Sequence, residues 1–275
     1  MNKKLINRIF VSVISVPILI LLVYIGKIYY LVFIIIVIGL SLWELLKLTK
    51  FPSIFLKIST ILIASLSVVS LYYNKFEYVV LLMLLLFSIN SIILMLFYKK
   101  NFINNLYLGI GAFIYPALSI SALVLIREFP KLISVPYNTG WLLGILLFLG
   151  IWICDCCAYF FGMAYGKNKI YPSVSPNKSW EGTIAGIFGS LIVYLIAFKF
   201  NVINFFNFWD YLAMALITGI FGQLGDFVES KIKRTIDVKD SSNLLMEHGG
   251  VLDRFDSLAL AAPIFLLYLY LRFVN

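Results

Sequence analysis

Basic and acidic side chains suited to phosphate chemistry gather between Ser230 and Asp256, in a chain that is otherwise strongly apolar. Lys233, Arg234 and Lys239 supply cations for phosphate oxygens, and the planar guanidinium binds such oxygens through two donors at once. A loop of solvated charges beside a membrane is the alternative interpretation, and it explains an isolated lysine adequately. It does not explain a mixture of both charge signs, so this segment predicts a site for a phosphorylated ligand.

Carboxylates accompany these cations. Four aspartates could bind a metal ion. They lie within this segment or directly before it: Asp226, Asp240, Asp253 and Asp256. Their oxygens are the ligands that Mg²⁺ prefers, usually one or two carboxylates together with substrate phosphates. Cations and carboxylates around one triphosphate-sized site form the arrangement that phosphoryl-type transfer requires.

The only histidine of the chain, His248, directly precedes Gly249 and Gly250. Two glycines allow a backbone to approach a phosphate closely. A single histidine is more often a structural hydrogen-bond partner than a catalytic base. We therefore expect His248 to bind phosphate or to order the loop rather than to transfer a proton.

A second group of polar residues begins with Asp155, 12 residues before Lys167. A helix of that length spans about 18 Å, so Asp155 is expected inside the membrane, facing protein or a polar cavity. A structural aspartate, hydrogen-bonded to a neighbouring helix, is the alternative. Ser175 and the proline after it predict a turn. Lys178 and Glu181 then stand at the start of the next apolar stretch, where Lys178 is placed to meet a lipid phosphate.

Glycines before the charged segment predict close helix packing. Gly219, Gly222 and Asp226 recur at three and four residues, so a helix places them on one face. Small residues there allow another helix to approach closely. Packing explains the glycines but not an aspartate at the membrane boundary, which is a functional candidate for that reason.

Three cysteines, Cys154, Cys156 and Cys157, lie within four residues of one apolar stretch. They are too close together for a disulfide framework. Cys154 and Cys157 share a helix face, which leaves a metal site as an alternative. We interpret them as buried free thiols, because no further ligand follows at the spacing of a metal site.

These residues must be positioned by helices in lipid. The chain has 275 residues, of which 62% are hydrophobic and 13% charged, whereas a soluble domain is about half apolar and about a quarter charged. A membrane-crossing helix needs about 20 apolar residues. Runs of this kind lie at 9–25, 28–44, 58–74, 78–98, 103–126, 140–162, 182–200, 211–228 and 256–273. We therefore predict an all-α, polytopic integral membrane protein with about nine transmembrane helices; the first could pass for a signal peptide, and 28–44 for a re-entrant segment.

Basic residues predict the orientation. With the N-terminus in the cytoplasm, 16 of the 22 lysines and arginines fall in cytoplasmic segments, as the positive-inside rule expects. The loops 163–181 and 229–255 then both face the cytoplasm, where nucleotides are. We therefore expect the net charge of +9 to interact with anionic lipids and phosphates rather than with nucleic acid. We expect the cell membrane, inner or plasma, as the location.

Acidic residues divide the chain into two parts. Of the 13, those before residue 150 are Glu44, Glu77 and Glu128, and the other ten fall between Asp155 and Asp256. We predict an N-terminal transmembrane scaffold over 1–135. A C-terminal transmembrane catalytic half over 136–275 would carry the signature loop 226–256.

The chain resembles the phosphatidate cytidylyltransferase family over roughly residues 150–260. The family signature reads Ser-x-x-Lys-Arg, four residues, Lys-Asp, then His-Gly-Gly-x-x-Asp-Arg-x-Asp. The matching positions are Ser230, Lys233, Arg234, Lys239, Asp240, His248, Gly249, Gly250, Asp253, Arg254 and Asp256, after a lead-in at Gly225, Asp226 and Glu229. The chain also resembles a second motif of the family, at Asp155, Ala158, Tyr159, Gly162, Ser175, Pro176, Lys178, Glu181 and Gly182. Met246 and Asn177 depart from the family pattern.

The resemblance implies that CTP and phosphatidate react to CDP-diacylglycerol and pyrophosphate, with Mg²⁺ as cofactor. The attacking phosphatidate oxygen is already anionic, so the site must overcome repulsion between phosphates rather than supply a strong base. By resemblance the metal ligands are Asp226 and Asp253, and the catalytic residues are Asp226, Lys233, Asp253 and Asp256. The implied substrate-binding residues are Asp155, Tyr159, Ser175, Lys178, Glu181, Ser230, Arg234, Lys239, Asp240, His248, Gly249, Gly250 and Arg254. Membrane lipids are further partners, and a homodimer is left open.

Other functions remain as alternatives. A CTP-dependent lipid alcohol kinase would release CDP instead of pyrophosphate. Formation of CDP-archaeol differs only in ether instead of ester lipid. Asp155 and Asp226 are also charges at membrane depth, as in a transporter or channel. The absence of repeated halves and the concentration of charge at one membrane face disfavour transport.

Overall fold

The computed structural model describes residues 3–98, 101–242, 244 and 249–274. In this part of the chain the structure is helical, and its only β-type pairing is an isolated bridge between Lys169 and Ser179. Eight helical segments there are long and apolar enough to cross a membrane, and α1 (Lys3–Ile25) adds a shorter apolar stretch, Val13–Ile25. The predicted all-α, polytopic fold is confirmed.

The chain forms two compact units. The first comprises Met1–Leu125 with Asp240–Phe255, and the second comprises Ile126–Lys239 with Asp256–Asn275. Both units therefore draw on segments that are far apart in the sequence. The predicted division into a scaffold over 1–135 and a catalytic half over 136–275 is a functional one, and it stays a prediction.

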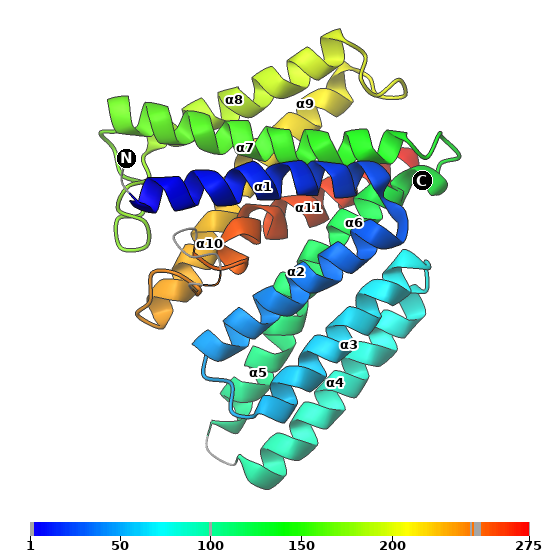
Figure 1. Cartoon of the computed structure of the whole chain (residues 1–275), viewed down its shortest axis with the longest axis vertical. Helices are drawn as coiled ribbons and strands as arrows, with labels where there is room; N and C mark the ends of the chain where they lie inside the picture. Colours follow the sequence, from blue (N-terminus) through cyan, green and yellow to red (C-terminus); the bar gives the residue numbers. More distant parts are fainter. Residues whose placement is uncertain (1–2, 99–100, 243, 245–248, 275) are drawn as a thin grey trace. The chain divides into compact units, whose positions relative to one another are not determined.

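Successive helices of the first unit pack against one another (Figure 1). After α1 they are α2 (Lys27–Leu48), α3 (Ile54–Tyr72), α4 (Phe76–Phe97), α5 (Phe102–Ala112) and the π-helical turn η1 (Phe113–Leu118). Tyr115 leaves the helical backbone region before Pro116, which explains the kink at η1. The segment expected as a possible re-entrant loop, 28–44, is one continuous helix, α2.

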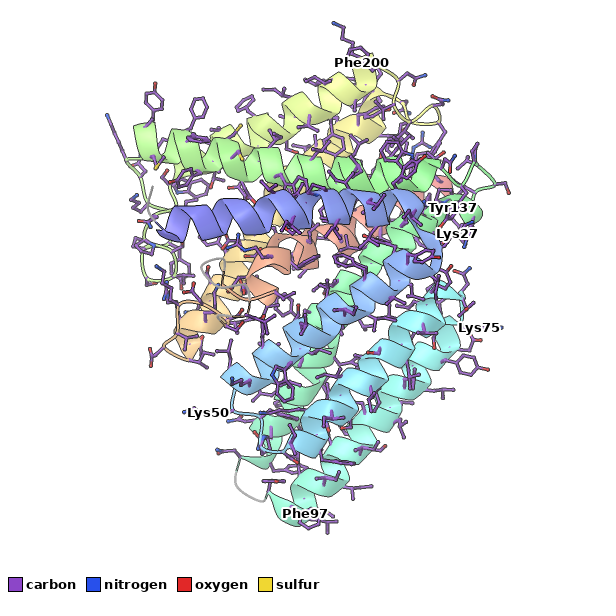
Figure 2. The ribbon with its side chains drawn as sticks, in the orientation of Figure 1. Lys27, Lys50, Lys75, Phe97, Tyr137 and Phe200 are labelled. Atoms are coloured by element: carbon purple, nitrogen blue, oxygen red, sulfur yellow. The ribbon has the colours of Figure 1, made fainter. Side chains whose placement is uncertain are left out.

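The connecting segments of this helix bundle lie alternately at its two ends. Lys27 and Lys75 lie at one end, and Lys50 and Phe97 lie at the other (Figure 2). The alternation of connecting segments from side to side is therefore as expected for successive membrane crossings.

The second unit is a bundle around two long neighbouring helices. Its helices are the last residues of α6 (Ser119–Glu128), η2 (Phe129–Lys131), α7 (Thr139–Tyr165), α8 (Trp180–Lys199), α9 (Phe208–Leu216), the π-helical turn η3 (Ile217–Phe221), α10 (Gly222–Thr235) and most of α11 (Leu252–Phe273). Helices α9, η3 and α10 run on without a break from Phe208 to Thr235.

Glycines on α8 allow it to lie directly against α7 (Figure 1). Gly182, Gly186 and Gly189 recur along the α8 face that meets α7. A Cβ at Gly186 would stand 2.9 Å from the backbone oxygen of Cys154, and one at Gly182 would stand 2.7 Å from that of Ala158. Backbone thus meets backbone, and larger residues would separate the two helices.

The three cysteines of α7 are free thiols, as predicted. Cys154 is buried against Gly186 and Cys157 is half-buried against Gly189. Cys156 is exposed, so the prediction of burial was wrong for this residue, because it turns away from the α7–α8 contact.

Glycines around η3 open contacts with three neighbouring helices. Gly219 faces Ile187 of α8, and Gly222 faces Ile151 of α7. A Cβ at Gly225 would stand only 2.4 Å from the backbone oxygen of Asp256 on α11. The predicted role of small residues in close helix approach is confirmed, and Gly225 brings the start of α10 to the backbone of α11.

The charged loop is shorter than the predicted 229–255. Helix α10 continues to Thr235 and α11 begins at Leu252, so Lys233 and Asp253 are helical. The apolar sequence ends within α10, but the helix continues beyond it because side-chain pairs four residues apart stabilise the helix. Basic residues in its last turn and Asp253 in the first turn of α11 also suit the helix dipoles.

Replacing Gly225 by alanine is expected to lower the melting temperature, because the new methyl group meets the backbone of α11 rather than a movable side chain. Overpacking of this kind costs about 1–3 kcal/mol. Gly111→Ala is the matched control, since nothing lies within 4 Å of its added Cβ. Thermal unfolding of both variants in detergent measures the difference, and equal melting temperatures would contradict the proposed contact.

Candidate functional site

Asp226 stands at the centre of the polar groups in the second unit. Its Oδ2 lies 2.6 Å from the Nζ of Lys178, which belongs to the loop before α8. Its Oδ1 accepts a 3.1 Å hydrogen bond from the Ser230 hydroxyl, one turn later on α10. Lys178 also lies over the ring of Phe227, 4.3 Å from its centroid. The lysine expected to meet a lipid phosphate is thus paired with a carboxylate, and its role toward lipid stays a prediction.

Two further carboxylates interact with Asp226. Asp155 of α7 is in electrostatic contact with Asp226, Asp256 and Lys178, and Asp256 of α11 is in contact with Asp226 and Lys233. Asp256 comes this close because Gly225 lets α10 and α11 touch. We call Asp155, Asp226, Asp256 and Lys178 the carboxylate cluster. Sequence reasoning named all four, and the structure brings them together from three helices and a loop.

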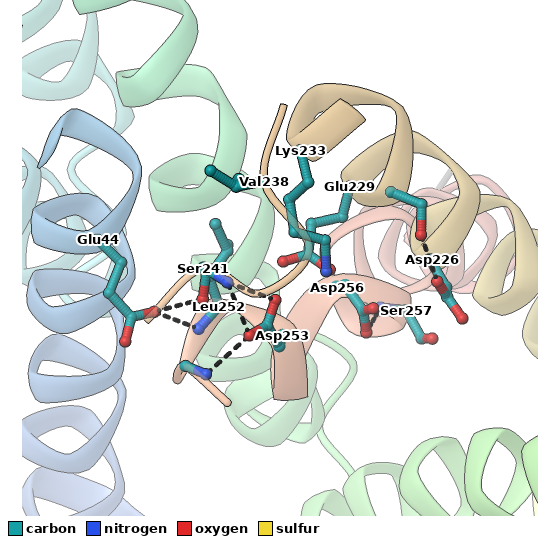
Figure 3. Close-up of polar contacts among 12 residues, drawn as sticks. Glu44, Asp226, Glu229, Lys233, Val238, Ser241, Leu252, Asp253, Asp256 and Ser257 are labelled. Carbon is teal, nitrogen blue, oxygen red and sulfur yellow. Dashed lines mark hydrogen bonds and ion pairs between the residues drawn. The ribbon is translucent and has the colours of Figure 1, made fainter. Parts of the chain in front are cut away.

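Glu229 extends the cluster along α10. It is fully buried, and one of its oxygens accepts a 3.0 Å hydrogen bond from Lys233, four residues later. It also contacts Asp256 (Figure 3). Carboxylates that meet in this way require a shared proton or a neighbouring cation. Sequence reasoning had Glu229 in the family lead-in and at helical spacing from Asp226 and Lys233, but it did not assign Glu229 to the site.

Hydrogen bonds within the loop 166–179 fix the position of Lys178. Glu181 of α8 accepts from the backbone N–H of Asn168 at 3.2 Å and from its side-chain amide at 2.8 Å. Ser179 caps α8 by accepting from the N–H of Gly182. The N–H of Lys178 donates to the oxygen of Ser175, which is the predicted turn. As placed here, Glu181 and Ser175 shape the loop, and substrate binding by them stays a prediction.

Arg234 ties the end of α10 to the same loop. Its Nε donates to the backbone oxygen of Val174 at 3.2 Å, and its Nη1 donates to that of Val238 at 3.2 Å. Tyr159 on α7 and Lys239 after α10 are exposed and are not drawn into the cluster. The substrate-binding roles predicted for Arg234, Tyr159 and Lys239 stay predictions.

The remaining predicted residues belong to the first unit. Asp253, in the first turn of α11, accepts from the N–H of Ser241 at 3.0 Å and from that of Gly250 at 2.7 Å. Gly249 has a φ of +81°, a backbone conformation that favours glycine. Asp240 and Arg254 are exposed. His248 and Met246 lie outside the described residues.

Glu44 of α2 is a buried carboxylate of the first unit that sequence reasoning missed. Its buried carboxylate accepts hydrogen bonds from Ser241 and Leu252 (Figure 3). It also accepts from Ser242 and Val251. The signal was present, because Glu44 is one of few acidic residues in the apolar first half of the chain. An ionisable group in such a stretch is a functional candidate.

The donor set of the carboxylate cluster suits Mg²⁺. Among the described residues, no group of three or more His, Cys, Asp or Glu side chains forms a ready-made metal cage. Mg²⁺ does not need such a cage, because it usually binds one or two carboxylates, substrate phosphates and water. Asp226 with Asp155 and Asp256 offers oxygen ligands of this type.

These features describe a polytopic helical protein with a carboxylate cluster that is suited to a divalent cation. Residues 6–272 match the family described as "Cytidylyltransferase family". The chain belongs to the cytidylyltransferase family, which confirms the predicted family and, at this level, the predicted nucleotidyltransferase.

Similar proteins carry a more specific name. A phosphatidate cytidylyltransferase of Staphylococcus aureus (strain COL) is 50% identical over 117 residues, and those of Staphylococcus haemolyticus and Staphylococcus epidermidis are 49% and 45% identical. Each match covers 42% of this chain and 45% of the relative. The chain thus spans about half the length of the curated relatives that it matches.

Replacing Lys178 by methionine is expected to make the stability of the protein depend on Mg²⁺. The variant leaves Asp226 without its direct cation, and the partly exposed pair contributes about 1 kcal/mol or less. Millimolar Mg²⁺ should then raise its melting temperature more than that of the wild type, because a divalent cation replaces the lost charge.

Lys199→Met is the matched control, since this exposed lysine lies at the opposite end of α8. An equal response to Mg²⁺ in both variants and the wild type would contradict the electrostatic account of the cluster.

Proposed function

We propose that the chain is a phosphatidate cytidylyltransferase, which converts CTP and phosphatidate to CDP-diacylglycerol and pyrophosphate. The observation that carries the proposal is the convergence of Asp155, Lys178, Asp226 and Asp256 in one unit of a membrane protein of the cytidylyltransferase family. The names of the staphylococcal relatives support phosphatidate as the lipid substrate.

The reaction requires charge neutralisation more than acid–base catalysis. An oxygen of the phosphatidate phosphomonoester attacks the α-phosphorus of CTP and forms a new P–O bond. The bond from the α-phosphorus to the bridging oxygen of the β-phosphate breaks, and its electron pair leaves with pyrophosphate. No proton transfer is needed for this balance, because the attacking oxygen is already ionised. The main barrier is repulsion between the two anionic substrates.

The charge of the cluster supports a metal requirement. Asp155, Asp226, Asp256 and Glu229 oppose Lys178 and Lys233, so four carboxylates face two ammonium groups and leave a formal charge of −2. A triphosphate would be repelled by such a surface. We propose Asp226 as an Mg²⁺ ligand with Asp155 and Asp256 beside it, and we keep Asp253 as the second proposed ligand. The bound ion would neutralise charge that develops on the phosphates.

The chain's own cations then have distinct proposed roles. Lys178 is held at its position by the ordered loop 166–179 and is placed to bind a phosphate when a metal ion takes over its carboxylate partner. Lys233 pairs with buried Glu229, which fixes its amine beside Asp256. We propose that both lysines hold phosphates during the attack, and that Ser230 and the loop glycines support binding.

We propose that the site faces the cytoplasm at the cell membrane. The excess of basic residues in the segments that would be cytoplasmic supports this orientation. The enzyme would then meet CTP from the cytoplasm and phosphatidate from the bilayer.

Product analysis tests the reaction directly. Purified protein is incubated with labelled CTP and phosphatidate, with and without Mg²⁺. The proposal expects labelled CDP-diacylglycerol and released pyrophosphate only with Mg²⁺. Released CDP with a phosphorylated lipid would instead indicate a lipid kinase, and solute flux in liposomes without product would indicate a transporter.

Asp226→Asn and Asp253→Asn are each expected to lower Mg²⁺-dependent turnover by about 100-fold or more, because each removes a charge assigned to metal binding. Asp237→Asn is the matched control. Asp237 is exposed between α10 and the loop glycines, and its positive φ of 56° suits asparagine equally. Initial rates on mixed micelles measure the effect, with size-exclusion profiles as the folding control. Turnover near the wild-type rate in both acidic variants would refute the metal assignment.

A further inference from the structure

We infer that Glu44 of α2 is a positioning residue, which fixes the Gly249–Gly250 segment and Asp253 for catalysis. The catalytic part of this inference rests on the proposed function. The structural part rests on contacts within the first unit alone. Glu44 lies about 200 residues before these partners in the sequence, so neither motif similarity nor local spacing indicates the connection.

The Glu44 carboxylate is fully occupied by donors. Oε1 accepts from the Ser242 hydroxyl at 2.5 Å and from the N–H of Val251 at 3.0 Å. Oε2 accepts from the Ser241 hydroxyl at 3.2 Å and from the N–H of Leu252 at 2.8 Å. The side chain is only 2% exposed. A buried carboxylate is tolerated when several hydrogen-bond donors satisfy it. Here the donors come from two segments, Ser241–Ser242 and Val251–Leu252.

Two of these donors lie at the start of α11: the N–H of Leu252, its first residue, and that of Val251, the residue directly before it. The first N–H groups of a helix have no partner within the helix, and an anion there is favourable toward the helix dipole. Glu44 therefore acts as a cap that comes from a distant helix. It determines where α11 starts and how its first turn, with Asp253, is oriented within this unit.

Ser241 and Gly250 connect Glu44 to Asp253, because each of them contacts both carboxylates. Ser241 donates its hydroxyl to Glu44 and its N–H to Asp253 (Figure 3). Gly250 donates its N–H to Asp253. A Cβ at Gly250 would stand 1.8 Å from the Ser241 hydroxyl and 2.6 Å from Glu44. Glycine at 250 is thus required by the Glu44 contact itself, in addition to any approach of a phosphate.

Hydrogen exchange measures the positioning without reference to activity. In purified Glu44→Gln, one acceptor oxygen becomes an amide that opposes the donors. The amides of Val251 and Leu252 are expected to exchange about tenfold or more faster, since hydrogen bonds to charged groups are lost. The value of kcat/KM for CTP, measured at saturating phosphatidate with Mg²⁺, is expected to fall about 10- to 100-fold, as for other residues that orient a ligand-binding carboxylate. Glu44→Asp keeps the charge and should recover part of both properties.

Asp210→Asn separates positioning from general stability. Asp210 is also buried, and it accepts hydrogen bonds from Tyr268 at 2.7 Å and Arg272 at 3.0 Å in the second unit. This control should lower the melting temperature while Val251 and Leu252 exchange at the wild-type rate and the KM for CTP is unchanged.

The outcomes distinguish this inference from the proposed function. Wild-type exchange at Val251 and Leu252 in Glu44→Gln, or an unchanged kcat/KM for CTP, would overturn the positioning role. An inactive wild-type protein would instead refute the proposed reaction, and the exchange rates would still decide whether Glu44 holds the segment.

Discussion

Repulsion among carboxylates that are forced together between packed helices is the constraint on which the second unit depends. Two like charges about 4 Å apart repel by about 4 kcal/mol at the effective dielectric constant of a protein surface. Asp155, Asp226 and Asp256 nevertheless interact with one another, and Lys178 is held against Asp226. The surrounding structure must therefore impose this arrangement, because the charges alone would separate the helices.

Close backbone contact between helices holds the carboxylates together against this repulsion. Gly182 and Gly186 bring α8 to α7, and Gly225 brings α10 to α11, so each carboxylate is carried to its place by packing in an apolar environment. In lipid, such close packing replaces the hydrophobic driving force that acts between helices in water. The loop before α8 then adds the cation, held by Glu181 and by the cap of Ser179.

The sequence was sufficient for the fold class and for most of the clustered residues, because both depend on local signals. Apolar runs of membrane length predict helices, and Asp155, Lys178, Asp226 and Asp256 are charges where charge is costly. Helix ends were predicted less well, since α10 continues into polar sequence through pairs such as Glu229 with Lys233. Glu44 was missed because its donors are distant in sequence, and no periodicity links it to Ser241 or Leu252.

The two acidic networks solve opposite electrostatic problems. Glu44 is surrounded by four donors, two of them at a helix start, and so it needs no further cation. The carboxylate cluster has more negative than positive groups, and so it is electrostatically incomplete without one. A saturated carboxylate fixes structure, whereas an under-neutralised cluster binds cations and, through them, anionic substrates. This contrast is the physical reason to assign a positioning role to Glu44 and a metal-binding role to Asp226.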